Sequence, residues 1–325
     1  MVAKATVRDV GGLGAGIDPV RFEVVRSALL AITEECGATL RRAAYSTNIK
    51  TRGDFSCAFF DRDCRAVAQA FAQPSHLGSL AHIVPKAVAQ YGKDNLQPGD
   101  MLLTNDPFTG GVHLNDISLI TPVFHQGKIY GFMANIAHHV DVGGGAPGSI
   151  GVSNEIYQEG LVIPPVRFVR DGQIDANIFN IIRSNFRGVH EISGDFRAQT
   201  AANRLGARRI QELLERYGAD ELYRYIDGLL DYTERRVRAE FATFPNGQWS
   251  AESHMDGDGV IDEPIRLKLK VIIKDGTVTV DLTDCADQRP SPTNATFSQT
   301  YSGVVYVLKC LLDPDIPVND GVYRL

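Results

Sequence analysis

The segment from Asn105 to Gly148 constrains the fold most, because short apolar runs alternate in it with clusters of histidine, aspartate and glycine. It holds four of the eight histidines of the chain, including the only adjacent pair, His138 and His139. The apolar runs predict three strands, at residues 97–104, 117–124 and 128–137. The polar clusters therefore fall on loops and strand ends of a sheet, where rigid elements can hold ligand side chains in place.

The spacing of these polar residues predicts a metal site. His113 and Asp116 stand three residues apart, and the histidine pair follows at the end of the last predicted strand. Adjacent side chains of a strand point to opposite faces, so at most one histidine of the pair would normally be a ligand. Two histidines and one carboxylate leave coordination positions open, which suits a catalytic Mn²⁺, Fe²⁺ or Zn²⁺. The alternative is a set of polar turn residues that bond only to the backbone.

Further residues are candidates for supporting roles. Asp141 and Asp106 could orient the imidazoles or act as a general base, and His139 is a second candidate catalytic residue. Four arginines flank Asp195, the predicted start of a helix, and could bind an anion, with a solvated helix face as the alternative. These are Arg183, Arg187, Arg197 and Arg204. Substrate or phosphate binding is assigned to Arg183, Arg197 and Asn105.

The sequence contains no GxxxxGK[ST], GxGxxG or GxSxG pattern, and so no nucleotide-binding or serine-hydrolase signature. If ATP is used, we expect another chain to bind it. Two further histidines near Pro85, His76 and His82, are expected in the core or on the surface.

Composition indicates a soluble globular protein. Its 325 residues exceed the roughly 250–300 that one hydrophobic core supports, which predicts at least two subdomains. The net charge of −6 argues against a nucleic-acid surface. Five scattered cysteines without a CxxC pair favour reduced thiols, and no apolar run approaches the ~20 residues of a membrane span. We therefore expect a cytoplasmic protein.

Hydrophobic periodicity and turn signals predict the other elements. An amphipathic helix should run from Asp18 to about Ala44, and a second one, capped by Asp195, should end before Gly218. Pro85 should kink or split a helix near it. The remaining predictions are a hairpin at 55–68, a helix at 220–241, a hairpin at 265–281 and a helix at 298–312.

The expected fold is α+β, with mixed sheets, packed helices and at least two subdomains. Residues 1–17 would form a flexible leader and residues 18–193 a metal-site subdomain. Residues 194–245 would form a helical segment, and residues 246–325 a second sheet subdomain that is incomplete at its C-terminus.

Six motifs occur along the chain in this order: NIKTRGDFSCAFFD (48–61), NDPFTGGVHLNDI (105–117), AHHVDVGG (137–144), IYQEGLVIPPVR (156–167), GDFRAQTAANRLGARR (194–209) and DPDIPVNDG (313–321). With these motifs the sequence resembles the hydantoinase B/oxoprolinase family, from about residue 18 to its end. The family includes the B-type component of N-methylhydantoinase, the C-terminal half of 5-oxoprolinase, and subunits of acetone and acetophenone carboxylases.

The resemblance implies an ATP-dependent enzyme that opens a cyclic amide, such as a hydantoin, 5-oxoproline or a lactam. ATP would be bound by a separate hydantoinase A-type subunit, and the substrate would be phosphorylated before the later chemistry. By likeness to the acetone carboxylase branch, manganese would be held at His113, Asp116 and His138, with Zn²⁺ or Fe²⁺ as alternatives. His139 should then point away from the ion or lie just behind its ligands.

Two other functions stay open. The chain could be a subunit of an ATP-dependent ketone carboxylase, in which the same ion would stabilise an enolate. It could also be a non-catalytic structural subunit that completes a partner's site. Members of the family continue beyond DPDIPVNDG, so a truncated product or a separately encoded remainder is expected, within a hetero-oligomer.

Overall fold

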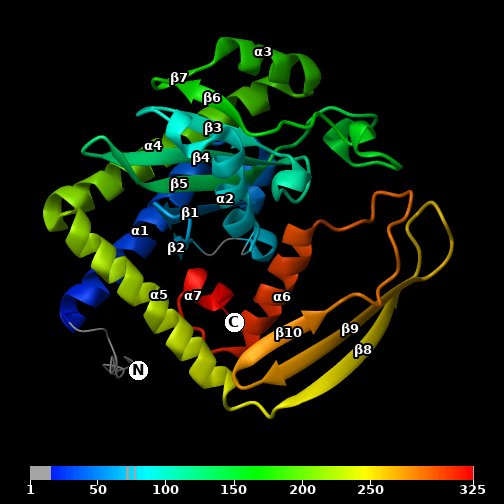
Figure 1. Cartoon of the computed structure of the whole chain (residues 1–325). Coiled ribbons are helices and arrows are strands. Elements are labelled where there is room, and N and C mark those ends of the chain that lie inside the picture. The colour runs from blue at the N-terminus through cyan, green and yellow to red at the C-terminus, as the bar shows by residue number, and fades with distance from the viewer. Residues whose placement is uncertain (1–15, 71–72, 77, 325) are drawn as a thin grey trace, which may run out of the picture.

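The structure is a computed structural model that describes residues 16–324, except 71–72 and 77. Most of the leader expected at residues 1–17 therefore lies outside the described residues. Two sheets, one of seven strands and one of three, combine with packed helices, which confirms the predicted α+β class (Figure 1). Mixed sheets were expected, but every described strand pair is antiparallel.

The seven-stranded sheet has the order β2-β1-β5-β4-β3-β6-β7. Its strands are β1 (Phe55–Asp61), β2 (Ala66–Gln69), β3 (Met101–Thr104), β4 (Asp116–His125), β5 (Lys128–His138), β6 (Val166–Arg170) and β7 (Gln173–Ile174). β4 and β5 form a hairpin whose turn residues, Gln126 and Gly127, have φ of 49° and 76°. Tight turns of this kind join antiparallel neighbours, which accounts for the β4–β5 pair; the antiparallel β1–β5 and β3–β6 pairs join strands that are distant in the sequence.

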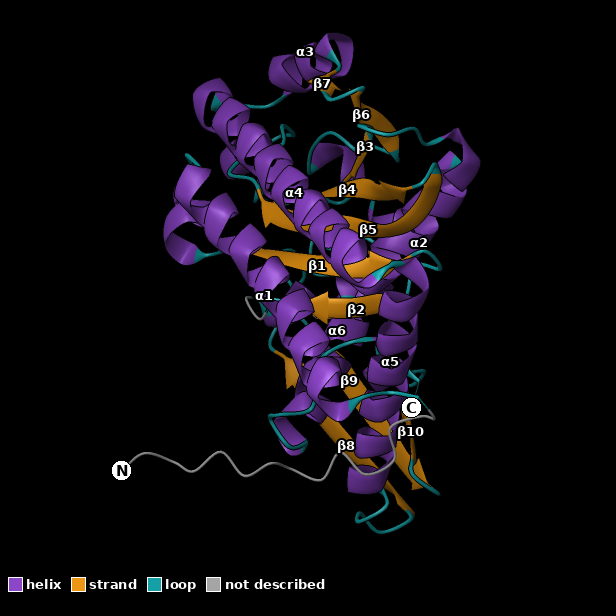
Figure 2. Cartoon of the chain, turned by 90° about the vertical axis from the view of Figure 1, so that its left-hand side faces the viewer, coloured by secondary structure: helices purple, strands orange, loops and turns teal. Residues whose placement is uncertain are grey.

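The two faces of this sheet are covered by different helices. On one face lie α1 (Pro19–Ala43) and α4 (Val189–Tyr217), with α5 (Ala219–Phe241) packed beside them (Figure 2). They pack on Met133 and Ala137 of β5. The other face is covered by α2 (Ser79–Tyr91), which packs on Phe132 and Ile136 of the same strand. Side-chain alternation along β5 therefore supplies both cores.

The predicted start of the first helix is confirmed, and the predicted start of α4 is wrong. The Asp18 side chain accepts a hydrogen bond from Arg21 N at 2.7 Å, ahead of Pro19 at the first helical position. α4 instead begins at Val189, and Asp195 lies inside it. The Asp195 carboxylate accepts from the backbone N–H groups of Tyr45 and Ser46, just beyond the end of α1. Asp195 therefore forms hydrogen bonds with the backbone of another segment, and the sequence around Asp195 gives no indication of this contact.

The second sheet has the order β10-β9-β8 and lies with the C-terminal helices. Its elements are β8 (Gly247–Met255), β9 (Ile265–Lys274), β10 (Thr277–Asp281), α6 (Phe297–Leu311) and α7 (Asp320–Tyr323). Val237 and Phe241, near the end of α5, pack with Val305 of α6 in a separate apolar cluster. α5 thus contributes to the cores of both parts of the chain, and the predicted domain boundaries stay a prediction.

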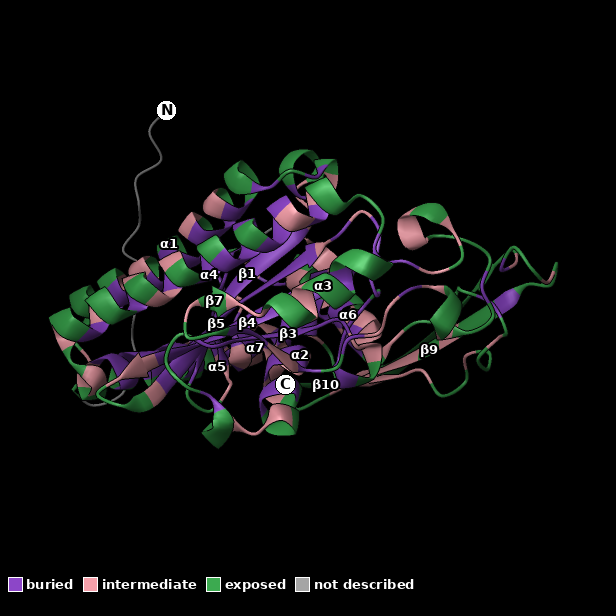
Figure 3. Ribbon diagram, turned by 90° about the horizontal axis from the view of Figure 1, so that it is seen from above, coloured by how far each residue is buried: buried purple, intermediate pink, exposed green. Residues whose placement is uncertain are grey.

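Burial follows these layers. Strands β1 to β5 of the seven-stranded sheet are largely buried between helices whose outer sides are exposed, whereas β6 and β7 at one edge are partly exposed (Figure 3). α2 continues through Pro85 and does not end there.

No helix of the described residues has the length and apolar character that crossing a bilayer requires.

Candidate metal centre

The register of the β4–β5 hairpin brings the predicted metal ligands together. Asp116 begins β4 and His138 ends β5, and the two residues stand directly opposite each other. His138 is in phase with Ile136, so its side chain points to the face that α2 covers. His113 lies in the turn before β4, where its carbonyl accepts from Asp116 N at 3.0 Å. The tight turn and the strand pairing therefore place all three side chains at one end of the sheet.

Within the described residues, His113, Asp116 and His138 offer ligand atoms that all lie within 4.8 Å of one another. His138 Nδ1 is 2.8 Å from Asp116 Oδ1, and His113 Nδ1 is 3.4 Å from Asp116 Oδ2. The Asp116 side chain is 3% exposed, whereas that of His113 is 67% exposed. The group, called here the His–Asp group, is therefore buried around its carboxylate and open to solvent beside His113.

The surroundings of Asp116 favour a negative charge. Burial by itself raises the pKa of Asp116, but the hydrogen bond with His138 and the nearby imidazole of His76 outweigh burial and hold this pKa well below its usual range. Burial also lowers the pKa of His138, but Asp116 and then Asp54 keep it above the ordinary histidine value. A fixed negative charge flanked by imidazoles attracts a cation.

The His–Asp group fits a divalent transition metal. Imidazole nitrogen and carboxylate oxygen are ligands that Mn²⁺, Fe²⁺ and Zn²⁺ accept. Three protein ligands leave further positions for water or substrate, and the exposed side at His113 gives access to them. A metal site requires its ligand side chains to converge, and these three side chains do. The presence of the metal stays a prediction.

His139 lies on the opposite face of the sheet from the His–Asp group. Its Nε2 is 2.9 Å from Gln199 Oε1 on α4, and its ring centroid is 4.6 Å from that of Phe196. Complete burial lowers the pKa of His139, which favours the neutral imidazole. The structure does not bring His139 to the His–Asp group, and a direct catalytic role for this residue stays a prediction.

Asp141 organises the glycine-rich loop after β5. Its carboxylate accepts from the backbone N–H groups of Gly143 and Gly148 at 2.8 Å. It also accepts from the backbone N–H and the guanidinium of Arg187, both at 3.1 Å. Arg187 donates in addition to three carbonyl oxygens of the same loop. Both side chains are therefore occupied in holding the loop, and the role of Asp141 in catalysis stays a prediction.

Asn105 is buried and holds the loop before β4. Its Oδ1 accepts from Ile163 N at 2.7 Å, and its Nδ2 donates to the carbonyls of Leu114 and Leu161. Asp106 accepts from a backbone N–H of the short helical turn that follows, at 2.8 Å. Through these hydrogen bonds both residues stabilise the loop before β4. Substrate binding by Asn105 stays a prediction.

The predicted phosphate-binding arginines lie away from the His–Asp group. Arg183 is on α3 (Ala176–Asn185) and Arg197 on α4, helices that share an apolar cluster on the face opposite α2. Both side chains are exposed, and the Arg183 guanidinium lies 5.7 Å from the centroid of the Phe179 ring. In the described part of the chain, neither arginine belongs to the set of side chains that converge on Asp116.

His76 lies beside the His–Asp group, which the sequence did not predict. Its Nε2 is 3.8 Å from Asp116 Oδ1, its Nδ1 is 3.2 Å from Ser56 Oγ, and its side chain is 1% exposed. Of the two positions expected for His76, core and surface, the structure shows the core. No spacing in the sequence links His76 to Asp116, because the contact depends on how β1 pairs with β5.

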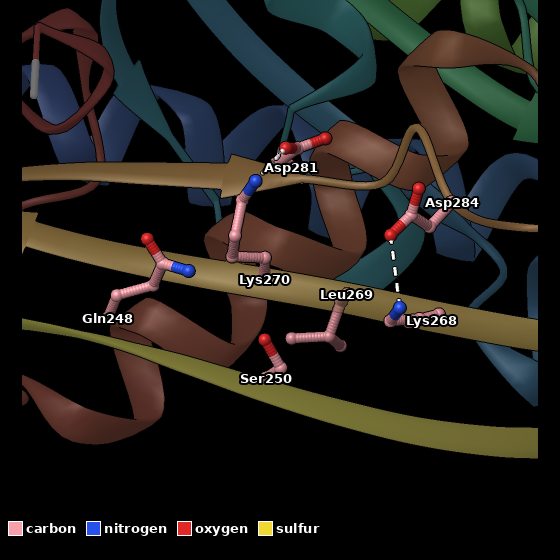
Figure 4. A pocket seen from close by; sticks show the side chains of 7 residues that line it. All are labelled: Gln248, Ser250, Lys268, Leu269, Lys270, Asp281 and Asp284. Carbon is pink, nitrogen blue, oxygen red and sulfur yellow. Dashed lines mark ion pairs between the residues drawn. The ribbon is translucent and has the colours of Figure 1, made fainter.

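A separate hollow of about 220 Å³ lies on the three-stranded sheet (Figure 4). Its charged side chains pair with one another, Lys268 with Asp284 at 3.1 Å and Lys270 with Asp281 at 2.8 Å. Gln248, Ser250 and Leu269 complete the lining. Because these charges neutralise each other, the His–Asp group is the better candidate for a cation site.

Fold and site together define an α+β protein with a candidate centre of two histidines and one aspartate at paired strand ends. Residues 18–325 match the family described as Hydantoinase B/oxoprolinase, and the chain belongs to this family. This confirms the resemblance seen in the six sequence motifs.

Several curated relatives match nearly the whole chain. Uncharacterized protein MJ0963 of Methanocaldococcus jannaschii is 39% identical over 95% of this chain and 55% of its own length. 5-Oxoprolinase 1 of Arabidopsis thaliana is 35% identical over 94% of this chain and 26% of its own length. The B-type subunit of a putative D-/L-hydantoinase from Pseudomonas sp. (strain NS671) is 31% identical, with shares of 95% and 55%. The chain thus spans between a quarter and about half of these proteins.

Two solved structures share the fold. The ATP-dependent caprolactamase from Pseudomonas jessenii has a TM-score of 0.89 and 32% identity, over 95% of this chain and 53% of that one. A nucleotide-free acetone carboxylase has a TM-score of 0.86 and 17% identity, over 94% of this chain and 42% of that one. At that identity the second likeness shows the fold alone.

Proposed function

We propose that the chain is the metal-bearing B-type subunit of an ATP-dependent amidohydrolase that opens cyclic amides. The observation that carries this proposal is the convergence of His113, Asp116 and His138 in a member of the hydantoinase B/oxoprolinase family. Three similar proteins are named 5-oxoprolinase, putative hydantoinase and caprolactamase, and each of these names refers to a cyclic amide as substrate. Hydantoins, 5-oxoproline and lactams are therefore the proposed substrate class.

A hydantoinase A-type subunit is the proposed partner, in a cytoplasmic hetero-oligomer. It would bind ATP and activate the amide by phosphorylation, since the chain carries no nucleotide-binding signature of its own. The name of the Pseudomonas hydantoinase relative, as one component of an enzyme, supports such a division of labour. The exposed side chains of Arg183 and Arg197 would then contact phosphate at the surface shared with this partner, because neither lies beside the His–Asp group.

A bound divalent metal, Mn²⁺ first and Zn²⁺ or Fe²⁺ as alternatives, would supply Lewis acidity toward a substrate oxygen. His113, Asp116 and His138 would hold it. Burial of Asp116 and His138 excludes water from one side, and exposed His113 leaves the other side open to substrate. The pKa of the buried Asp116 carboxyl lies well below its usual range, so the group is ionised at neutral pH and can attract a cation.

Asp141, His139 and Asn105 would support this centre from outside it. Asp141 fixes the glycine-rich loop, whose Gly148 carbonyl accepts from Asn115 Nδ2 at 3.3 Å, next to Asp116. His139 ties the end of β5 to α4. Asn105 would contribute to substrate binding by holding the loop that carries His113.

A reconstituted assay tests the function. The chain is combined with its A-type partner, ATP, Mn²⁺ and a panel of hydantoin, 5-oxoproline and caprolactam. We expect ring opening that requires ATP and partner and falls about 100-fold or more in Asp116→Asn, because the buried charge is lost. No ring opening of any panel member would contradict the hydrolase proposal.

The same assay with labelled bicarbonate and a ketone separates the alternatives. Label retained in an acid-stable product identifies a ketone carboxylase and contradicts hydrolysis. Full ring-opening activity of a metal-free complex, or of His113→Ala, identifies a non-catalytic structural subunit.

A further inference from the structure

We propose that His76 is a positioning residue of the metal centre, which orients the Asp116 carboxylate toward His113 and His138 while Ser56 fixes the tautomer of its imidazole. This inference rests on the proposed metal function and deepens it. His76 belongs to no motif of the sequence analysis.

The three residues of this chain of contacts come from separate segments and meet on one face of the sheet. Ser56 of β1 pairs with Ile136 of β5, and Ile136 packs on α2. Asp116 is in phase with Ile120 of β4, which belongs to the same apolar cluster. His76, from the short helix η2 (Pro74–His76), fills the space between Ser56 and Asp116.

The chemistry of the neighbours assigns the tautomer. His76 Nε2 is the ring nitrogen that faces a carboxylate oxygen of Asp116, which is an acceptor, so we place the proton on Nε2. Nδ1 is then an acceptor, and the Ser56 hydroxyl donates to it at 3.2 Å. The 3.8 Å from Nε2 to Asp116 Oδ1 exceeds a hydrogen bond, and a shift of less than about 1 Å would close it.

The backbone of His76 is anchored, so its ring is held against Asp116. Its carbonyl accepts from Gln69 Nε2 at 3.1 Å, and its N–H donates to the Gln73 carbonyl at 3.0 Å. Two residues further on, Gly78 N–H donates to Ser302 Oγ of α6 at 3.0 Å. The C-terminal part of the chain therefore supports the segment that carries His76.

His82 shows what a histidine without this role looks like in the same region. Its ring packs edge-on against Phe297 and Tyr301. Its Nε2 is buried and has no hydrogen-bond partner in the described residues. Both ring nitrogens of His76, by contrast, face polar groups, so His76 is more than an apolar filler of the core.

The test measures metal binding by calorimetry with Mn²⁺ and by the absorption spectrum of the Co²⁺-loaded chain. We expect His76→Leu to weaken binding about 10- to 100-fold and to change the Co²⁺ spectrum, because a ligand loses the group that orients it. His76→Gln keeps an N–H donor near the position of Nε2 and should recover most of the affinity. His82→Leu, the matched control, should bind as the wild type does.

Each outcome decides the inference. Equal affinity of His76→Leu and wild type overturns it and leaves the proposed function intact. A loss that His76→Gln does not recover indicates packing alone and also overturns it. If His76→Leu does not fold by circular dichroism, Ser56→Ala replaces it, and an unchanged affinity in that variant overturns the inference. Absence of binding by the wild type instead overturns the proposed metal centre itself.

Discussion

Asp116 is the residue at which the contacts of the site meet. It is buried, lies opposite His138 across the β4–β5 pair, and has His113 and His76 beside it. A buried carboxylate among histidines contributes little to the stability of the fold, since the cost of desolvation offsets much of the attraction between the charges. A carboxyl group whose pKa lies far from its usual range, at a strand end next to exposed His113, is instead typical of a functional site.

At the scale of residues, local spacing predicted part of the site. His113 and Asp116 are neighbours along the chain, and strand alternation predicted that His138 and His139 point to opposite faces. The family resemblance, and not the alternation, selected His138 as the ligand. His76 could not be found in this way, because it reaches Asp116 only through the pairing of β1 with β5. Residue type made Asp141 a candidate for orienting the imidazoles or acting as a base, but it could not predict the bonds of Asp141 within the loop, which depend on the path of the loop.

Asp141→Asn should destabilise the fold by about 1–3 kcal/mol at pH 7, because it removes a carboxylate that accepts four hydrogen bonds. Burial raises the pKa of Asp141, but bonds from Gly143, Arg187 and Gly148 outweigh it and hold the pKa below its ordinary value. A depressed folded-state pKa stabilises above the unfolded value of about 4, and this stability is lost as the pH falls through the folded value.

Urea unfolding at pH 7 and below pH 4 measures this difference. The deficit of Asp141→Asn relative to wild type should shrink at the lower pH. Asp94→Asn, at an exposed position, is the control and should change little at either pH. A deficit that is equal at both values would contradict the role assigned to the ionised carboxylate.

At the scale of elements, α4 is tied to the sheet by polar side chains as well as by apolar packing. Gln199 Nε2 donates to the Ile117 carbonyl and to Asn135 Oδ1, both at 2.9 Å. Asn203 Nδ2 donates to the Leu119 carbonyl at 2.9 Å. These amides are buried, so each needs its partners and together they fix the register of α4 on β4 and β5.

Gln199→Leu should cost about 1–3 kcal/mol of unfolding free energy, since it leaves buried polar groups of Asn135 and His139 without a partner. Chemical denaturation measures the loss. Gln211→Leu, at an exposed position of the same helix, should stay within about 0.5 kcal/mol of wild type. Equal stability of the two variants would show that the buried amides do not hold α4.

Two helical glycines give a matched pair. A Cβ at Gly206 of α4 would lie 2.6 Å from both Cys36 Sγ and Met133 Cε, whereas one at Gly303 of α6 meets nothing within 4 Å. Gly206→Ala should therefore destabilise by about 1–3 kcal/mol. Gly303→Ala should stabilise by about 0.5–1 kcal/mol through helix propensity. Thermal unfolding measures both changes: the melting temperature should fall for Gly206→Ala and rise for Gly303→Ala. Destabilisation by both substitutions would contradict this packing.

Helices and hairpins with a clear period could be predicted from the sequence, and elements fixed by distant contacts could not. Periodic apolar residues located α1, and the Asp-Gly turn located the β9–β10 hairpin. The start of α4 was misplaced, because Asp195 has the composition of a cap but bonds to Tyr45 and Ser46. Antiparallel pairing throughout the sheets also depends on long-range register.

At the scale of the molecule, the site draws on both parts of the chain. The candidate ligands come from the β4–β5 hairpin and the turn before it, and η2, which carries His76, packs against α6 of the C-terminal part. The chain spans about half of the Methanocaldococcus relative and of the caprolactamase. The proposed ATP-dependent activity involves the proposed A-type partner, whereas the proposed metal centre is built from residues of this chain.

Metal content and affinity of the isolated chain test the central claim most directly. After loading with Mn²⁺, Fe²⁺ or Zn²⁺ in turn, we expect about one ion per wild-type chain. Asp116→Asn and His113→Ala should each weaken binding by about 100-fold or more, and His125→Ala, at the other end of β4, should not. Failure of the folded wild type to bind any of the three ions, or full binding by Asp116→Asn, would contradict the claim.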